Sequence, residues 1–306
     1  MRRRTTRLPA HGVTSFVPTV VTSGAEARQQ MLDTIAAGPP PGYMGAQVLG
    51  THFEGPFISP QASGAHDRAH LRLPADANVD VSMWSRDAGV RMVTLAPELP
   101  GALDLARQLV ERGVVVSAGH SEASFEQGRA GIEAGIRYAT HVLNAMPELG
   151  HREPGLAGAV LSDPRVTVGL IPDGIHVHPA VAGLICSAVG LHRLSVVTDA
   201  TAGLGMEPGR YSLGGREVEV DGTSVRLVDD GRLAGSALTA DQAIRGIVAM
   251  TGWTPLEAVR SITSVPAKLL GLEDRGEIRV GARADFTLFT NDLQVIATYI
   301  GGEKWA

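Results

Sequence analysis

Four of the apolar runs in this 306-residue sequence end on side chains that can bind a metal or move a proton. The run AQVLGTHFE ends on Glu54, and GVVVSAGHS ends beside His120. His141 lies in IRYATHVLN and Asp199 in RLSVVTDAT. A carboxylate and two imidazoles suit a divalent transition metal such as zinc, with a position left for water. A further carboxylate could then transfer protons to and from that water. Each residue alone also fits a structural role, His120 as a core histidine and Asp199 as a helix N-cap, but together they favour a metal-dependent hydrolytic site.

Short apolar runs that alternate with helical patterns supply the elements that must position these side chains. We expect strands at residues 14–21, 46–54, 90–98, 113–121, 136–144, 166–174 and 193–201. Amphipathic segments such as 100–113 and 124–135 lie between them and close on glycine. This alternation predicts parallel βα units whose strands are covered on both faces, as in a barrel or a doubly wound sheet. All four candidates fall at the carboxyl ends of strands, where α/β barrels build their active sites.

The pattern changes after Gly205. Period-two alternation and glycine-containing turns over residues 209–236 predict antiparallel strands, inserted at about residues 205–233. Helical patterns then resume, and short strands end the chain. We therefore expect a barrel domain over residues 1–274 and part of a small β domain over residues 275–306.

Composition narrows the classes of partner. The formal net charge is -5 and no run of lysines or arginines follows the MRRRTTR opening, which argues against a nucleic-acid or anionic-membrane partner. No apolar segment follows that opening and no stretch approaches 18 apolar residues, so we expect neither a secretory signal nor a membrane span. The only cysteine, Cys186, lies in an apolar helical pattern, and we interpret it as a buried residue of a cytoplasmic protein.

An ordered set of motifs resembles those of the N-acetylglucosamine-6-phosphate deacetylases of the amidohydrolase superfamily, from about residue 11 to the C-terminus. The motifs are THFEGPF, GAHD, SAGHS, THVLNAMP, REPGLAG, DGIHV, VTDAT and LAGSALT. The resemblance implies a distorted (β/α)8 TIM-type barrel with a small β-sandwich domain, usually as a homodimer. It also implies hydrolysis of the acetamide of N-acetyl-D-glucosamine 6-phosphate, giving D-glucosamine 6-phosphate and acetate in amino-sugar catabolism.

The same resemblance implies roles for individual residues. The ligands of one divalent ion per chain would be Glu54, His120 and His141. Zinc is the expected ion, with iron, manganese or cobalt as alternatives. The proton-transferring group would be Asp199. The implied substrate contacts fall on Ala65, His66, Asn144, Ala145, Arg152, Asp173, Gly174, Ile175, His176, Leu233, Ala234 and Gly235. Arg152 would offer a planar pair of donors to the phosphate, although without the motif it reads as a surface arginine beside Glu153.

The sequence departs from the resembled family at its beginning. Family members carry a first barrel strand with a His-x-His segment before the part that corresponds to HGVTSF. We expect this chain to lack that strand. The strands at 14–21 and 193–201 would then lie at open edges of the sheet. Either the reading frame starts upstream or the chain is a truncated paralogue. His11 cannot replace the missing pair because it lies at a predicted helix end, and the HVH at 176–178 is in the wrong place, directly before Pro179.

Two alternatives to the deacetylase stay open. Another barrel hydrolase, such as a dihydroorotase-like cyclic amidase, is less compatible with Arg152 and the NAMP motif. The second alternative is a non-catalytic remnant that binds only sugar phosphate or a partner chain.

Overall fold

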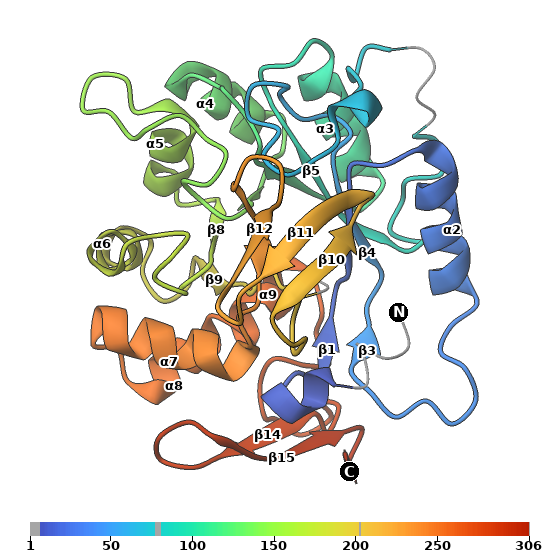
Figure 1. The fold of residues 1–306 in the computed structure, drawn as a ribbon, viewed down its shortest axis with the longest axis vertical. Helices are drawn as coiled ribbons and strands as arrows, with labels where there is room; N and C mark the ends of the chain where they lie inside the picture. The colour runs from blue at the N-terminus through green and yellow to red at the C-terminus, as the bar shows by residue number, and fades with distance from the viewer. Residues whose placement is uncertain (1–6, 77–80, 202, 306) are drawn as a thin grey trace.

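All seven predicted strands are present in one parallel sheet. The structure, a computed structural model, describes residues 7–76, 81–201 and 203–305, so most of the basic opening, residues 1–6, lies outside it. The sheet order is β2-β4-β5-β6-β7-β8-β9. The strands are β2 Thr19–Val21, β4 Thr51–Glu54, β5 Val90–Leu95, β6 Val115–Ala118, β7 Tyr138–Ala139, β8 Thr167–Leu170 and β9 Leu194–Val196. The sheet curls into an incomplete barrel whose edges, in the described part of the chain, are β2 and β9, which confirms the (β/α) barrel type (Figure 1).

Helices surround this sheet, as the alternating pattern predicts (Figure 1). The helices are α2 Ala25–Ala36, α3 Ala102–Glu111, α4 Phe125–Glu133, α5 Gly155–Ser162, α6 Pro179–Val189, α7 Ala240–Thr251, α8 Pro255–Arg260 and α9 Ser264–Leu269. Helix α3 buries Leu105 and Leu109, four residues apart, against the core, and α4 begins at a capping box between Ser124 and Gln127. Cys186 is buried on α6, as expected. None of the described helices is long and apolar enough to cross a bilayer.

The predicted insertion forms a separate four-stranded antiparallel sheet. Its strands are β10 Gly209–Leu213, β11 Arg216–Val220, β12 Ser224–Leu227 and β13 Leu233–Ser236. Near β9 the Ser236 N–H donates to the Asp199 carbonyl at 2.8 Å, while at the other end Gly214 lies against Val21 of β2. The insertion sheet therefore reaches from one edge strand of the barrel to the other, across the carboxyl ends of the strands (Figure 1).

The two ends of the described chain lie together. Strands β14 Phe286–Phe289, β15 Val295–Ile300 and β16 Glu303–Lys304 form a small antiparallel sheet. The short 3-10 helix η1, Leu8–His11, packs on it, since the Thr298 hydroxyl donates to the Pro9 carbonyl at 2.6 Å. A second short ladder pairs β1 Ser15–Phe16 with β3 Gln47–Val48. The boundary between residues 274 and 275 stays a prediction.

Candidate metal and substrate site

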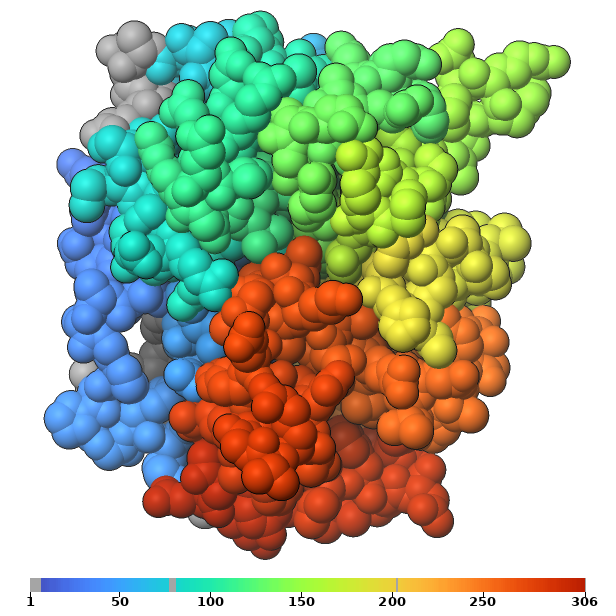
Figure 2. Space-filling model, turned by 180° about the vertical axis from the view of Figure 1, so that it is seen from behind, coloured from blue at the N-terminus to red at the C-terminus, as the bar shows by residue number. Residues whose placement is uncertain are grey.

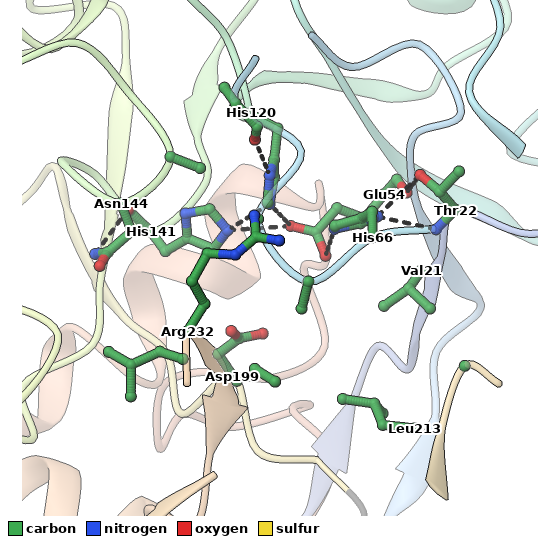
Figure 3. A pocket seen from close by; sticks show the side chains of 18 of the residues that line it. Val21, Thr22, Glu54, His66, His120, His141, Asn144, Asp199, Leu213 and Arg232 are labelled. Carbon is green, nitrogen blue, oxygen red and sulfur yellow. Dashed lines mark hydrogen bonds and ion pairs between the residues drawn. The ribbon is translucent and has the colours of Figure 1, made fainter. Parts of the chain in front are cut away.

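The three predicted ligands lie at the carboxyl ends of three strands of the parallel sheet and converge at one point (Figure 3). Glu54 is the last residue of β4, and His120 and His141 each lie two residues beyond β6 and β7. Glu54 Oε1 is 3.3 Å from His120 Nε2 and 3.2 Å from His141 Nε2, and the two nitrogens are 3.1 Å apart. Ligand atoms at about 2.0–2.1 Å from a tetrahedral zinc ion would be separated by roughly 3.3 Å. The spacing of the three atoms therefore fits one small divalent cation.

An unusual backbone conformation turns these side chains inward. His120, His141 and Asp199 have φ values of 49°, 30° and 48°, in the left-handed region that non-glycine residues seldom adopt. Backbone hydrogen bonds hold the turns, for example from the Ser59 N–H to the His120 carbonyl at 2.8 Å. Gly235 allows the insertion strand to approach Asp199, because a Cβ there would lie 2.7 Å from the Asp199 carbonyl oxygen.

Hydrogen bonding prepares His120 and Glu54 to receive a cation. His120 Nδ1 donates to the Ala62 carbonyl at 2.8 Å, which leaves the Nε2 lone pair facing the cluster. Glu54 is 5% exposed, and its Oε1 accepts no hydrogen bond from any residue that the structure describes, although it is buried between two imidazoles. Buried charges are normally paired or coordinate a metal, so this oxygen fits a metal-ligand role. His141 Nδ1 is likewise buried without a hydrogen-bond partner among the described residues.

The ionisable groups at the site perturb one another. Burial alone would raise the pKa of Glu54, but the adjacent imidazoles of His120 and His141 hold it well below its usual value. Burial and the negative charge of Glu54 raise the pKa of Asp199. Two carboxyl groups at one site thus differ in proton affinity, an arrangement typical of an acid or base paired with an ionised ligand.

His66, predicted as a substrate contact, lies directly beside Glu54. The Thr22 backbone N–H donates to His66 Nδ1 at 3.1 Å, so in the neutral ring the proton is on Nε2. That nitrogen is 3.6 Å from Glu54 Oε2. Burial lowers the pKa of His66 to about 3, which keeps the ring neutral at neutral pH. His66 can therefore offer one fixed N–H to the site.

A pocket of about 430 Å³ opens over the cluster. The predicted residues in its wall are Glu54, Ala65, His66, His120, His141, Asn144, Ala145, His176, Asp199, Leu233, Ala234 and Gly235. Asp173, Gly174 and Ile175 are outside the wall. Asp173 instead accepts a 2.6 Å hydrogen bond from His176 Nδ1 and so orients that ring.

Arg152 is not brought into this pocket. It is exposed on the segment after β7, and its Nη1 contacts His151 Nε2 at 2.8 Å. Figures 1 and 2 both show the yellow-green chain near residue 150 projecting from the body of the molecule. A phosphate contact from Arg152 stays a prediction.

Two histidines that were not predicted as metal ligands, His178 and His11, make contacts at helix ends. His178 is the N-cap of α6, where its Nδ1 accepts from the Ala180 N–H at 3.2 Å. His11 Nδ1 lies 3.4 Å from Asp241, at the end of η1.

Several residues of the pocket wall were not predicted from the sequence, among them Thr22, Gln61, Glu122 and Arg232. Arg232 is next to the predicted Leu233, and that adjacency is the only sequence signal that pointed to it. The others reach the pocket through the tertiary arrangement.

Comparisons with known proteins agree with this geometry. A model described as the amidohydrolase family matches residues 1–304. An N-acetylglucosamine-6-phosphate deacetylase of Bos taurus is 42% identical, over 97% of this chain and 74% of that protein. An N-acetylgalactosamine-6-phosphate deacetylase of Escherichia coli O157:H7 is 41% identical, over 95% of this chain and 77% of that protein.

Among solved structures, a mutant N-acetyl-D-glucosamine-6-phosphate deacetylase from Mycobacterium smegmatis in complex with N-acetyl-D-glucosamine-6-phosphate is 39% identical. It superposes with a TM-score of 0.89, covering 99% of this chain and 80% of that one. The chain belongs to the amidohydrolase family and, within it, to the N-acetylglucosamine-6-phosphate deacetylases.

Proposed function

We propose that this chain hydrolyses the acetamide of N-acetyl-D-glucosamine 6-phosphate, releasing acetate and D-glucosamine 6-phosphate. The observation that carries the proposal is the set of ligand atoms of Glu54, His120 and His141, 3.1–3.3 Å apart at the base of a pocket that Asp199 also lines. Family membership supports the reaction class.

Each residue at the base of the pocket has a chemical task in this proposal. Glu54, His120 and His141 hold a divalent cation, which when bound supplies Lewis acidity toward water and the amide oxygen. Asp199 accepts a proton from the attacking water and delivers it to the amine that leaves. The His66 Nε2–H can donate to the amide oxygen as negative charge develops there.

The wall of the pocket would bind the sugar. Asn144 Nδ2 donates to the carbonyls of His141 and Val142, which leaves its amide oxygen to accept from a sugar hydroxyl. His176, oriented by Asp173, presents Nε2 to the pocket. Leu233, Ala234 and Gly235 contribute backbone groups from the insertion sheet, and Ala65 and Ala145 complete the contacts of the wall. Gly174 and Ile175, which lie outside the wall, are kept as contacts on the family resemblance alone. We retain Arg152 as a phosphate contact from the projecting segment near residue 150.

A second candidate substrate is the C4 epimer, N-acetyl-D-galactosamine 6-phosphate. The relative named for that substrate is 41% identical to this chain, nearly as similar as the Bos taurus protein. Both sugars carry the same acetamide and phosphate, so the metal cluster and Asp199 serve either. Discrimination would depend on hydrogen bonds to the 4-hydroxyl from the pocket wall.

The test is acetate release by the metal-loaded protein from both phosphorylated sugars, with bound metal per chain measured in the same samples. Metal-dependent turnover with a higher kcat/KM for the glucosamine derivative is the expected result. A preference for the galactosamine derivative favours the second substrate. Metal binding without acetate release, together with hydrolysis of dihydroorotate, would favour a cyclic amidase. Binding of the sugar phosphate without any turnover would favour the non-catalytic remnant.

Four further parts of the proposal have their own measurements. We propose zinc as the metal, since two imidazoles and one carboxylate suit it, and metal analysis of the purified protein decides between zinc, iron, manganese and cobalt. We carry over the homodimer from the family resemblance, and light scattering measures it. We propose a cytoplasmic location because the single cysteine, Cys186, is buried and unpaired, and cell fractionation checks it.

We also propose a catalytic unit of residues 1–274 and a β-sandwich part of residues 275–306, and limited proteolysis tests this division.

A further inference from the structure

One acidic side chain outside the pocket holds the chain next to a predicted metal ligand. Glu98 lies in the loop after β5, where it is half-buried and outside the pocket wall. Its Oε2 accepts from the Ser121 hydroxyl at 2.6 Å, and its Oε1 accepts from the Glu122 backbone N–H at 2.7 Å. Ser121 and Glu122 directly follow His120 in the sequence. A single carboxylate therefore clamps the two residues after the ligand.

The backbone at His120 requires such a restraint. Its φ of 49° lies in the left-handed region, a conformation that non-glycine residues keep only where the surrounding contacts enforce it. The His120 carbonyl accepts from the Ser59 N–H at 2.8 Å, and the Ser121 N–H donates to the Ala145 carbonyl at 3.1 Å. Together with the hydrogen bonds to Glu98, these contacts fix the peptide that follows the ligand.

Ser121 also connects the turn of His120 to the turn of His141. The Ala145 carbonyl that accepts from the Ser121 N–H lies in the turn after His141, where the Asn144 N–H donates to the His141 carbonyl at 3.0 Å. Ala145 has a φ of 51°, so this turn is restrained in the same way. The separation of 3.1 Å between the Nε2 atoms of His120 and His141 thus depends on how Ser121 is held.

Glu98 can act as a fixed point because its own loop is tied to the segment that follows Glu54. The Ala96 N–H donates to the Phe57 carbonyl at 2.8 Å, and the Leu99 N–H donates to the Ala96 carbonyl at 3.2 Å. Phe57 is fully buried three residues after Glu54, so this attachment is rigid. Glu98 therefore relates the turn of one imidazole ligand to the strand end that carries the carboxylate ligand.

We propose that Glu98 is a positioning residue of the metal site, which fixes Ser121 and Glu122 and thereby the direction in which His120 presents Nε2 to the cation. This inference rests on the metal site of the proposed function. Glu98 acts through the backbone, since it is outside both the ligand cluster and the pocket wall. Its two hydrogen bonds have the short lengths of charge-assisted bonds, so the ionised carboxylate holds the segment more firmly than a neutral group would.

The experiment compares Glu98→Ala and Glu98→Gln with the same two substitutions of Glu257 in the 306-residue chain. Glu257 is a matched control because its Oε2 accepts from the Thr254 backbone N–H and from the Thr254 hydroxyl, both at 2.8 Å, at the start of α8. It makes the same two kinds of hydrogen bond as Glu98, but outside the pocket wall and the ligand turns. The dissociation constants of Zn²⁺ and Co²⁺ are measured by competition with a chelator, together with the visible absorption of bound Co²⁺ and the urea midpoint.

Glu98→Ala should weaken binding of both ions by roughly 10- to 100-fold, the range typical for loss of a group that orients a metal ligand. The visible spectrum of bound Co²⁺ should also change, because the released turn alters the direction of the His120 ring. Glu98→Gln should recover part of the affinity, since its amide oxygen can accept from the Glu122 N–H and the Ser121 hydroxyl can accept from its amide nitrogen. Both Glu257 variants should keep the wild-type dissociation constants and spectrum, even where the urea midpoint falls.

Wild-type metal affinity and spectrum in folded Glu98→Ala would overturn the inference. Equal weakening in Glu257→Ala would also overturn it, because the effect would then come from general loss of stability. If Glu98→Ala does not fold, Glu98→Gln and Ser121→Ala decide, and wild-type affinity in both would refute the positioning role. A wild-type chain that binds metal but releases no acetate refutes the deacetylase reaction alone, whereas a wild-type chain that binds neither ion refutes the metal site and this inference together.

Discussion

Asp199→Asn is the substitution that tests the assigned chemistry most directly. Asparagine has the same shape as aspartate but cannot accept and return a proton. The backbone at this position is fixed from outside, since the Asp199 carbonyl accepts from the Ser236 N–H at 2.8 Å and the Ser236 hydroxyl donates to the Thr198 carbonyl. The substituted side chain should therefore occupy the same place in the pocket.

The expected size of the effect follows from what is removed and what remains. General acid–base catalysis contributes about 10²- to 10⁴-fold in rate, or roughly 3–5.5 kcal/mol of barrier. The ligand atoms belong to Glu54, His120 and His141, and among the described residues none of these makes a hydrogen bond to the Asp199 side chain. Turnover should therefore fall by two to four orders of magnitude, while metal content and KM change little.

The assay measures acetate release from N-acetyl-D-glucosamine 6-phosphate at saturating substrate, with metal per chain determined on the same preparation. A variant that keeps near-normal kcat with full metal content would refute the role of Asp199. A variant that loses metal in proportion to activity would instead make Asp199 a ligand.

The same substitution has an expected effect on stability. Burial and the charge of Glu54 raise the pKa of Asp199, so above the unfolded-state pKa of about 3.9 the ionised carboxylate destabilises the folded metal-free protein. Asp199→Asn should then increase the unfolding midpoint of the chelator-treated protein at pH 7 and have a smaller effect at pH 3. A decrease at pH 7 would contradict the electrostatic account.

Three further outcomes are expected. Glu54→Gln should lower bound metal well below that of wild type, because it removes the only charged ligand, and metal analysis after dialysis measures this, with chelated wild type as the reference. Arg152→Ala should weaken the phosphorylated sugar by roughly 1.5–3 kcal/mol relative to the unphosphorylated one, and comparison of KM values checks it; equal losses would contradict a phosphate role. Thr94→Val should lower the free energy of unfolding by about 1–3 kcal/mol, because it leaves the buried His52 Nε2, 2.7 Å from the Thr94 hydroxyl, without that partner and removes one of the two hydrogen bonds of the Thr140 hydroxyl, which keeps Ser117 at 2.6 Å. Urea denaturation measures that loss, and no change would show that the network has repacked.

The sequence by itself determined the order and type of the elements. Apolar runs of strand length and amphipathic segments that end on glycine are local patterns, and hydrophobic burial converts them directly into strands and helices. The sequence also determined the chemistry available at the strand ends, since Glu54, His120, His141 and Asp199 each follow an apolar run. Parallel strands place such residues at one edge of a sheet, so the sequence alone predicts their convergence.

Only the tertiary structure decided which other side chains surround that cluster. The Thr22 N–H that fixes the tautomer of His66 is 44 residues away in sequence, and Arg232 enters the pocket because the insertion sheet spans from β9 to β2. Arg152 belongs to a motif of the resemblance, yet it is exposed and lies outside the pocket wall. Local periodicity carries no information on which distant segments will meet, because those contacts depend on how the insertion packs across the strand ends, and that packing is a property of the whole fold.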